Sequence, residues 1–155
     1  MPRRSTTSAL GSLLFAATAA SAFAANSPAV PGGVDPRSVD MAREARRAVA
    51  IIEAFYADHH ACPQPSDPDE LRELQSALGD GFLAERQGEF VTISGISMIS
   101  GNWRYYASPR YPDRCTLWRK ISGDRMVIWR RHRYGAGWNL NPGDGTPERA
   151  FKVSP

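Results

Sequence analysis

Cysteine is scarce in the sequence, and neither an internal repeat nor a low-complexity tract occurs. A serine in a Gly-x-Ser-x-Gly turn is missing, as is a set of metal ligands at a recognised spacing. The sequence therefore favours a protein that is not an enzyme and holds no metal or cofactor, although catalysis stays open. Its 155 residues, 42% hydrophobic and 23% charged, exclude a collagen-like, coiled-coil or wholly disordered chain. This length is typical of one domain.

The most extended apolar run lies near the N-terminus, from Ala9 to Ala20, after two arginines and before Ala22-Phe23-Ala24. This order predicts a cleaved signal peptide over residues 1–24. The run is too short, and too diluted by Ser and Thr, for a membrane span. Residues 25–34 are rich in Pro and Gly, which predicts a flexible leader before a single domain over 35–155. Export would place the protein in the periplasm or outside the cell, without a stable membrane anchor.

Cys62 and Cys115 are the two cysteines of the chain. In an oxidising compartment an even number of cysteines predicts a disulfide, here between Cys62 and Cys115. A metal site that uses His59, His60, Cys62 and His132 is an alternative, but adjacent histidines do not easily face one ion. A Cys–His nucleophile is a further alternative. The compartment favours the disulfide over both.

The order of apolar residues predicts two helices followed by strands. Asp35-Pro36 or Ser38 begins a helix that runs to about His59, and Asp67-Pro68 begins a short helix that Gly79 ends. Strands are expected at residues 82–85, 90–93, 96–99, 102–107, 115–121, 126–134 and 150–153. The predicted fold is α+β: an N-terminal amphipathic helix and a short helix packed on an antiparallel meander sheet.

Several of these segments resemble parts of a known family. Residues 50–63, which end a helix with Phe55-Tyr56 and then reach Cys62-Pro63, resemble the helix end of type IV pilins and type II secretion pseudopilins. The Trp103-Arg104-Tyr105-Tyr106 strand, the turn at Gly123-Asp124 and the loop at Gly143-Asp144-Gly145 continue the resemblance over about residues 38–148. The resemblance implies a pilin-like head domain.

Pilins also keep a long apolar helix that continues from the N-terminus into the head. Here Pro28, Pro31 and the Gly32-Gly33 pair interrupt any such helix. The resemblance therefore implies a pilin-like head that acts as a stand-alone module, rather than a filament subunit that packs through its N-terminal helix.

Charge is unevenly distributed along the chain. Residues 35–89 hold 12 acidic and 6 basic residues, whereas residues 101–135 hold 2 acidic and 9 basic residues interleaved with aromatics. A sheet with one positive face would recognise an acidic partner; the alternative is a solvated surface of arginines over an aromatic core. The candidate binding residues are Arg104, Tyr106, Arg119, Trp129, Arg130, Arg131 and Arg133.

Together these features predict an exported, non-enzymatic binding module of the bacterial cell envelope. It would act in a secretion or pilus-type assembly, or bind another envelope or secreted protein with an acidic surface. Alternatives are an immunity or inhibitor protein against a secreted hydrolase or toxin, and a small periplasmic enzyme on an anionic or glycan substrate. The sequence argues against nucleic acid as the partner.

Overall fold

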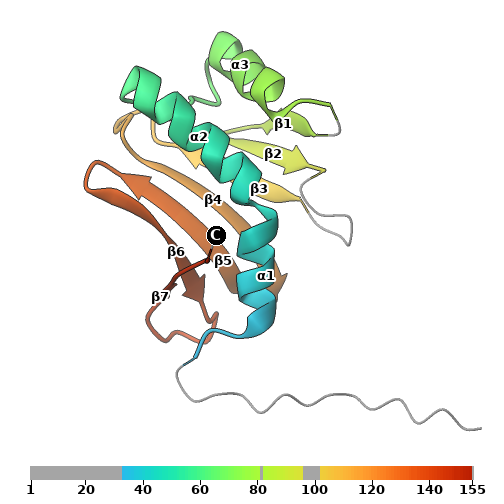
Figure 1. Cartoon of the computed structure of the whole chain (residues 1–155), viewed down its shortest axis with the longest axis vertical. Helices are drawn as coiled ribbons and strands as arrows, with labels where there is room; N and C mark the ends of the chain where they lie inside the picture. Colours follow the sequence, from blue (N-terminus) through green and yellow to red (C-terminus); the bar gives the residue numbers. More distant parts are fainter. Residues whose placement is uncertain (1–32, 81, 96–101, 155) are drawn as a thin grey trace, which may run out of the picture.

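Seven strands form one antiparallel sheet in which each strand pairs with the next along the chain, in the order β1 to β7 (Figure 1). The computed structural model describes residues 33–80, 82–95 and 102–154. The strands are β1 (Leu83–Gln87), β2 (Phe90–Ser94), β3 (Trp103–Ala107), β4 (Cys115–Ser122), β5 (Arg125–His132), β6 (Gly135–Asn141) and β7 (Arg149–Phe151). The α+β class and the meander are confirmed. The predicted strand at 96–99, the signal peptide and most of the leader lie outside the described residues.

The long predicted helix is divided in two, α1 (Pro36–Glu44) and α2 (Arg46–His59). Asp35 caps α1 as predicted: its carboxylate accepts hydrogen bonds from the Ser38 amide at 3.2 Å and the Ser38 hydroxyl at 2.6 Å. The division is slight, because the Ala45 amide still donates to Met41 and the Ala45 carbonyl accepts from Val49. The two helices therefore lie nearly end to end across one face of the sheet (Figure 1).

The short helix α3 (Pro68–Leu78) begins and ends at the predicted residues. The Asp67 carboxylate accepts from the Asp69 and Glu70 amides, and Gly79, with a φ of 78°, is the C-cap. A side chain of α3 also bonds to the edge of the sheet. Gln75 donates to the Phe82 carbonyl at 2.7 Å and accepts from the Ala84 amide at 2.5 Å.

The core lies between the sheet and the helices. A row of directly paired residues crosses the sheet from β2 to β7, and directly paired residues share a face. Its members are Val91, Tyr105, Leu117, Trp129, Trp138 and Phe151. Apolar residues at helical spacing on α1 and α2 join the same cluster, among them Met41, Ala45, Ala48 and Ile52. We call this side of the sheet the inner face.

Strand β6 is absent from the predicted set, and β5 ends two residues earlier than predicted. The β5–β6 hairpin turns at Arg133-Tyr134, and Gly135 has a φ of 147°. Glycines weaken the propensity of a segment for strand, so Gly135 and Gly137 concealed a strand whose Trp138 and Leu140 alternate correctly. The turn predicted around Gly123-Asp124 is confirmed between β4 and β5.

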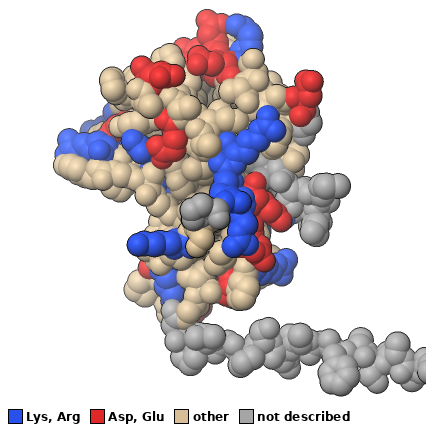
Figure 2. Space-filling model, in the orientation of Figure 1, with Lys and Arg blue, Asp and Glu red and all other residues tan. Residues whose placement is uncertain are grey.

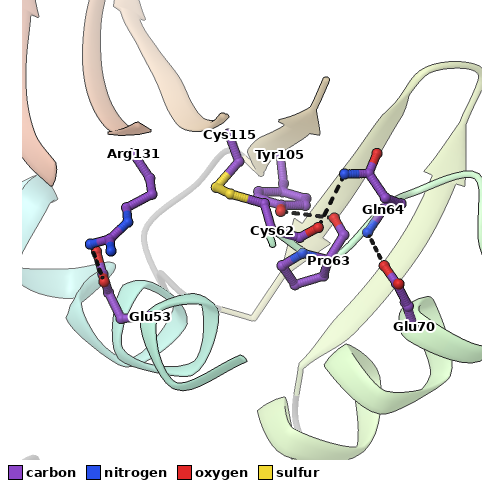
Figure 3. Close-up of a disulfide and its surroundings, with 8 residues drawn as sticks. All are labelled: Glu53, Cys62, Pro63, Gln64, Glu70, Tyr105, Cys115 and Arg131. Carbon is purple, nitrogen blue, oxygen red and sulfur yellow. Dashed lines mark hydrogen bonds and ion pairs between the residues drawn. A yellow bond between two sulfur atoms is a disulfide. The ribbon is translucent and has the colours of Figure 1, made fainter. Parts of the chain in front are cut away.

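The predicted disulfide joins Cys62, just after α2, to Cys115 at the start of β4 (Figure 3). The Cys62 amide also donates to the Pro112 carbonyl at 2.7 Å, and the Tyr105 hydroxyl donates to the Pro63 carbonyl at 2.9 Å. Burial, and then the charge of Glu70, raise the pKa of Tyr105 well above its usual value, so this hydroxyl stays protonated and donates. We call this group of contacts the α2–β4 clamp.

Removing the disulfide should lower the free energy of unfolding by about 4 kcal/mol. A cross-link that closes a loop of this length reduces the entropy of the unfolded chain, and this raises its free energy by about that much. The variant is Cys62→Ser with Cys115→Ser, compared with the wild type in urea with and without reductant. Reductant should bring the wild type to the stability of the variant and leave the variant unchanged. Reactive thiols in protein isolated from the periplasm would contradict the disulfide in the cell.

Ile52→Asp should destabilise the protein by about 4 kcal/mol or more, because Ile52 is fully buried against the sheet and the new carboxylate would have no partner. Ala54→Asp is the matched control, since Ala54 lies on the same helix but is exposed. Thermal unfolding followed by circular dichroism distinguishes them. Equal melting temperatures for the two variants would show that α2 does not pack on the inner face.

Candidate binding surface

The face of the sheet opposite the helices, which we call the outer face, carries the side chains that alternate with the core residues. None of the described helices covers it (Figure 1). Aromatic and aliphatic side chains still gather there. Ile128 is only 4% exposed because its neighbours shield it. An uncovered apolar sheet face of this kind is a feature of interaction surfaces.

A groove of about 370 Å³ lies at the centre of the outer face. Its lining consists of Glu89, Phe90, Tyr106, Thr116, Trp118, Met126, Ile128 and Arg130. The Phe90 ring meets Trp118 at 76° and Tyr106 at 54°, with centroids 5.2 and 6.0 Å apart. These rings are mutually tilted, so they form a cupped apolar surface rather than a flat platform on which a sugar ring would stack.

Basic side chains line a further depression at each end of this groove. One, of about 290 Å³, contains Arg104 and Lys120 and has Trp118 in common with the central groove. The other, of about 280 Å³, contains Arg114 and Arg133 beside the acid Asp113, and has Thr116 and Arg130 in common with the central groove. The three depressions therefore follow the outer face of β4, along which Thr116 and Trp118 are half-buried and Lys120 is exposed.

The predicted binding residues separate into two groups. Arg119 and Arg131 point to the helices, where they pair with Glu44 at 3.5 Å and Glu53 at 2.7 Å. Figure 3 shows the contact between Arg131 and Glu53. Arg131 also lies over the Tyr56 ring, 3.9 Å from its centroid. Trp129 is 2% exposed and belongs to the core. Trp129 thus packs in the core. Arg119 and Arg131 form ion pairs with the helices and also line the two end depressions.

The other four predicted residues lie on the outer face or at its end. Arg104 and Arg133 are exposed and Tyr106 is half-buried in the groove. Arg130 forms a two-pronged pair with Glu148, of which one contact is 2.8 Å. Hydrogen bonding to Glu148 raises the pKa of Arg130, and the same bond lowers the pKa of Glu148.

Most of the residues that line the groove were not predicted from the sequence. Phe90, Trp118, Met126 and Ile128 line it, yet none was a candidate binding residue. The alternation of Val91 and Ile93 with Phe90 and Thr92 places these two sets on opposite faces. That alternation alone does not tell which set meets the helices.

Several basic residues of the sheet pair with acids elsewhere in the fold, so they do not all contribute to one positive face. Arg119 pairs with Glu44, Arg131 with Glu53, and Arg125 with Asp35. On the helical side of the molecule, basic and acidic side chains lie next to one another (Figure 2). On the outer face, the basic side chains without an acidic partner in the described chain lie at the two ends of the groove.

The alternative sites for metal or nucleophilic chemistry lose their main residue, since Cys62 is part of a disulfide. His59 stacks on Phe55 with ring centroids 4.1 Å apart and lies 3.5 Å from Glu73. In the described part of the chain no cluster of three potential metal ligands occurs. The Asp144 carboxylate accepts from the Thr146 amide and hydroxyl, as a turn residue does.

Comparisons of the chain with protein-family models, curated proteins and solved structures return no match. The resemblance to pilin heads therefore stays a prediction from the sequence. Within the described residues, none of the helices combines the length and apolar character that crossing a bilayer requires.

The pairing of Asp35 should make stability depend on pH. Burial alone would raise the pKa of Asp35, but hydrogen bonds from Ser38 and the charge of Arg125 hold it below its usual value. The stabilisation is therefore present above the usual carboxylate pKa and is lost as the pH falls through the lowered one. Asp35→Asn, which keeps a capping oxygen, should be less stable than the wild type at pH 7. The two proteins should become equally stable once the pH is low enough to protonate the Asp35 carboxyl.

Urea unfolding of both proteins across this pH range measures the difference. Asp35→Ala is the companion variant and should lose about 1 kcal/mol more than Asp35→Asn, because it also removes the helix cap. A difference between the wild type and Asp35→Asn that persists undiminished at low pH would rule out the ionised carboxylate as its cause.

Proposed function

We propose that the protein is an exported, non-enzymatic binding module with a pilin-like head, and that it binds another protein through the outer face of its sheet. The observation that carries the proposal is the apolar groove along β4, on a sheet whose other face is already covered by helices. Interface centres are enriched in aromatic residues, Met and Arg, and this groove combines Phe90, Trp118, Met126 and Arg130.

Export is supported by two independent features. The disulfide in the described chain is consistent with an oxidising compartment. The N-terminal sequence has the order of a signal peptide, which leads to the periplasm or the medium. An envelope or secreted protein is therefore the natural partner, in a secretion or pilus-type assembly or as the target of an inhibitor.

The test is capture of the partner from an envelope extract with the exported, disulfide-bonded protein, followed by affinity measurement with the purified pair. Trp118→Ala should weaken binding at least tenfold, since a Trp at the centre of an interface commonly contributes most of the affinity. Arg72→Ala is the control, because Arg72 is exposed on α3. Its affinity should equal that of the wild type.

Two results would contradict the proposal. A captured partner that binds Trp118→Ala as tightly as the wild type would move the binding site away from the outer face. Turnover of a cell-wall glycan or phosphoester by the purified protein would establish an enzyme instead.

A further inference from the structure

On the outer face, apolar and charged side chains are separated along β4. The central groove is apolar, and its one arginine, Arg130, is neutralised by Glu148. At one end Arg104 has no ion-pair partner among the described residues, and Lys120 lies 3.6 Å from Asp124 with both side chains more than half exposed. Such an exposed contact adds little stability and leaves the charge available.

The opposite end is similar. Arg114 and Arg133 lie over the rings of Tyr111 and Tyr134, 4.4 and 4.6 Å from the centroids. Neither arginine has an acidic partner in the described part of the chain. This contrasts with the arginines of the inner face, which pair with helix acids. The cations that remain available thus lie at both ends of an apolar centre, about 20 Å apart, as the rise per strand residue from Arg114 to Lys120 implies.

This arrangement argues against several occupants. A second copy of the chain, docked face to face, would bring like charges together. A nucleic acid needs cations along its whole length, whereas the centre is apolar and Glu89 lines it. A flat glycan would need coplanar rings, and these rings are tilted by 54° and 76°.

The backbone hydrogen bonding of β4 favours a helix over an extended segment as the occupant of the groove. Strand β4 pairs with β3 on one side and β5 on the other, so its amides and carbonyls are engaged in the sheet. An extended segment laid on this face would bury backbone groups without partners, which costs free energy. An α-helix satisfies its own backbone and packs on a sheet through its side chains alone.

We infer that the groove binds an amphipathic helix of the partner, with an apolar stripe in the middle and carboxylates in its first and last turns. This inference rests on the proposed function and specifies the partner's chemistry. A span of about 20 Å corresponds to roughly 13 helical residues, or between three and four turns. The apolar stripe contacts Phe90, Trp118 and Ile128, and the terminal acids pair with Arg104 and Lys120 at one end and Arg114 and Arg133 at the other.

The probe is a synthetic 15-residue helical peptide with Leu along one face and Glu in its first and last turns. One comparison peptide carries Gln in place of each Glu, and another carries a central Pro that breaks the helix. The acidic helix should bind the full disulfide-bonded protein, the Gln peptide at least tenfold more weakly, and the Pro peptide not measurably. NMR shifts should map the acidic peptide to β4 and its neighbours.

Charge reversal tests the two ends. Arg104→Glu with Lys120→Glu should weaken the acidic peptide at least tenfold and leave the Gln peptide unaffected. Arg43→Glu with Arg46→Glu is the matched control, because both residues are exposed on the helical side, and it should bind like the wild type. Circular dichroism and an intact disulfide verify that each variant is folded.

Four outcomes would each overturn the inference. They are equal affinity for the acidic and Gln peptides, equal affinity for the acidic and Pro peptides, no binding of any peptide, and NMR shifts away from β4. These failures are distinguishable from failure of the proposed function. If the captured envelope partner still loses affinity with Trp118→Ala while the acidic helix does not bind, the outer face is a binding site for a partner of another chemistry. If the captured partner binds Trp118→Ala as tightly as the wild type and the acidic helix does not bind, both proposals are wrong.

Discussion

The α2–β4 clamp is the constraint on which the rest of the structure depends. One covalent bond and two hydrogen bonds fix the chain where it leaves the helices, through Cys62 to β4, through the Cys62 amide to Pro112, and through Pro63 to Tyr105. His60 adopts a left-handed conformation, with a φ of 54°, and ends α2 just before this point. With its end held against the sheet, the helical layer covers the inner face, and α3 reaches the edge at β1. The outer face stays open as a result.

Charge follows the same division into layers. The acids that dominate the first half of the sequence lie largely on the helices, and several of them pair with arginines at the borders of the inner face. These pairs satisfy cations that would otherwise be partly buried without a partner, which is costly. Part of the positive charge of residues 101–135 is therefore neutralised by ion pairs within the fold. On the outer face, the cations without an acidic partner among the residues that the structure describes lie at its two ends, which makes their placement informative about function.

Local chemistry explains which elements could be predicted. The caps at Asp35 and Asp67, the end of α3 at Gly79, the hairpin at Gly123-Asp124 and the disulfide all depend on a few neighbouring residues or on compartment. The glycines of β6 hid a strand that is stabilised by pairing with β5 and β7. The binding surface was harder to predict, because β4 and β5 each carry one Trp and the two lie on opposite faces of the sheet. Only the position of the helices shows which of the two, Trp118 or Trp129, is buried in the core. Ion pairs such as Arg131–Glu53 join residues 78 positions apart, beyond the reach of local patterns.

The two hydrogen bonds from Gln75 have a consequence for behaviour in solution. The outermost strand of a sheet exposes unpaired backbone groups and invites edge-to-edge association with other chains. At β1 the Gln75 amide acts as a substitute strand, since it donates to Phe82 and accepts from Ala84. A foreign strand would have to displace this side chain together with α3. The far edge is β7, which is only three residues long and offers little template. A meander with both edges protected in this way can display an apolar face to a partner without growing into a continuous sheet at high local concentration.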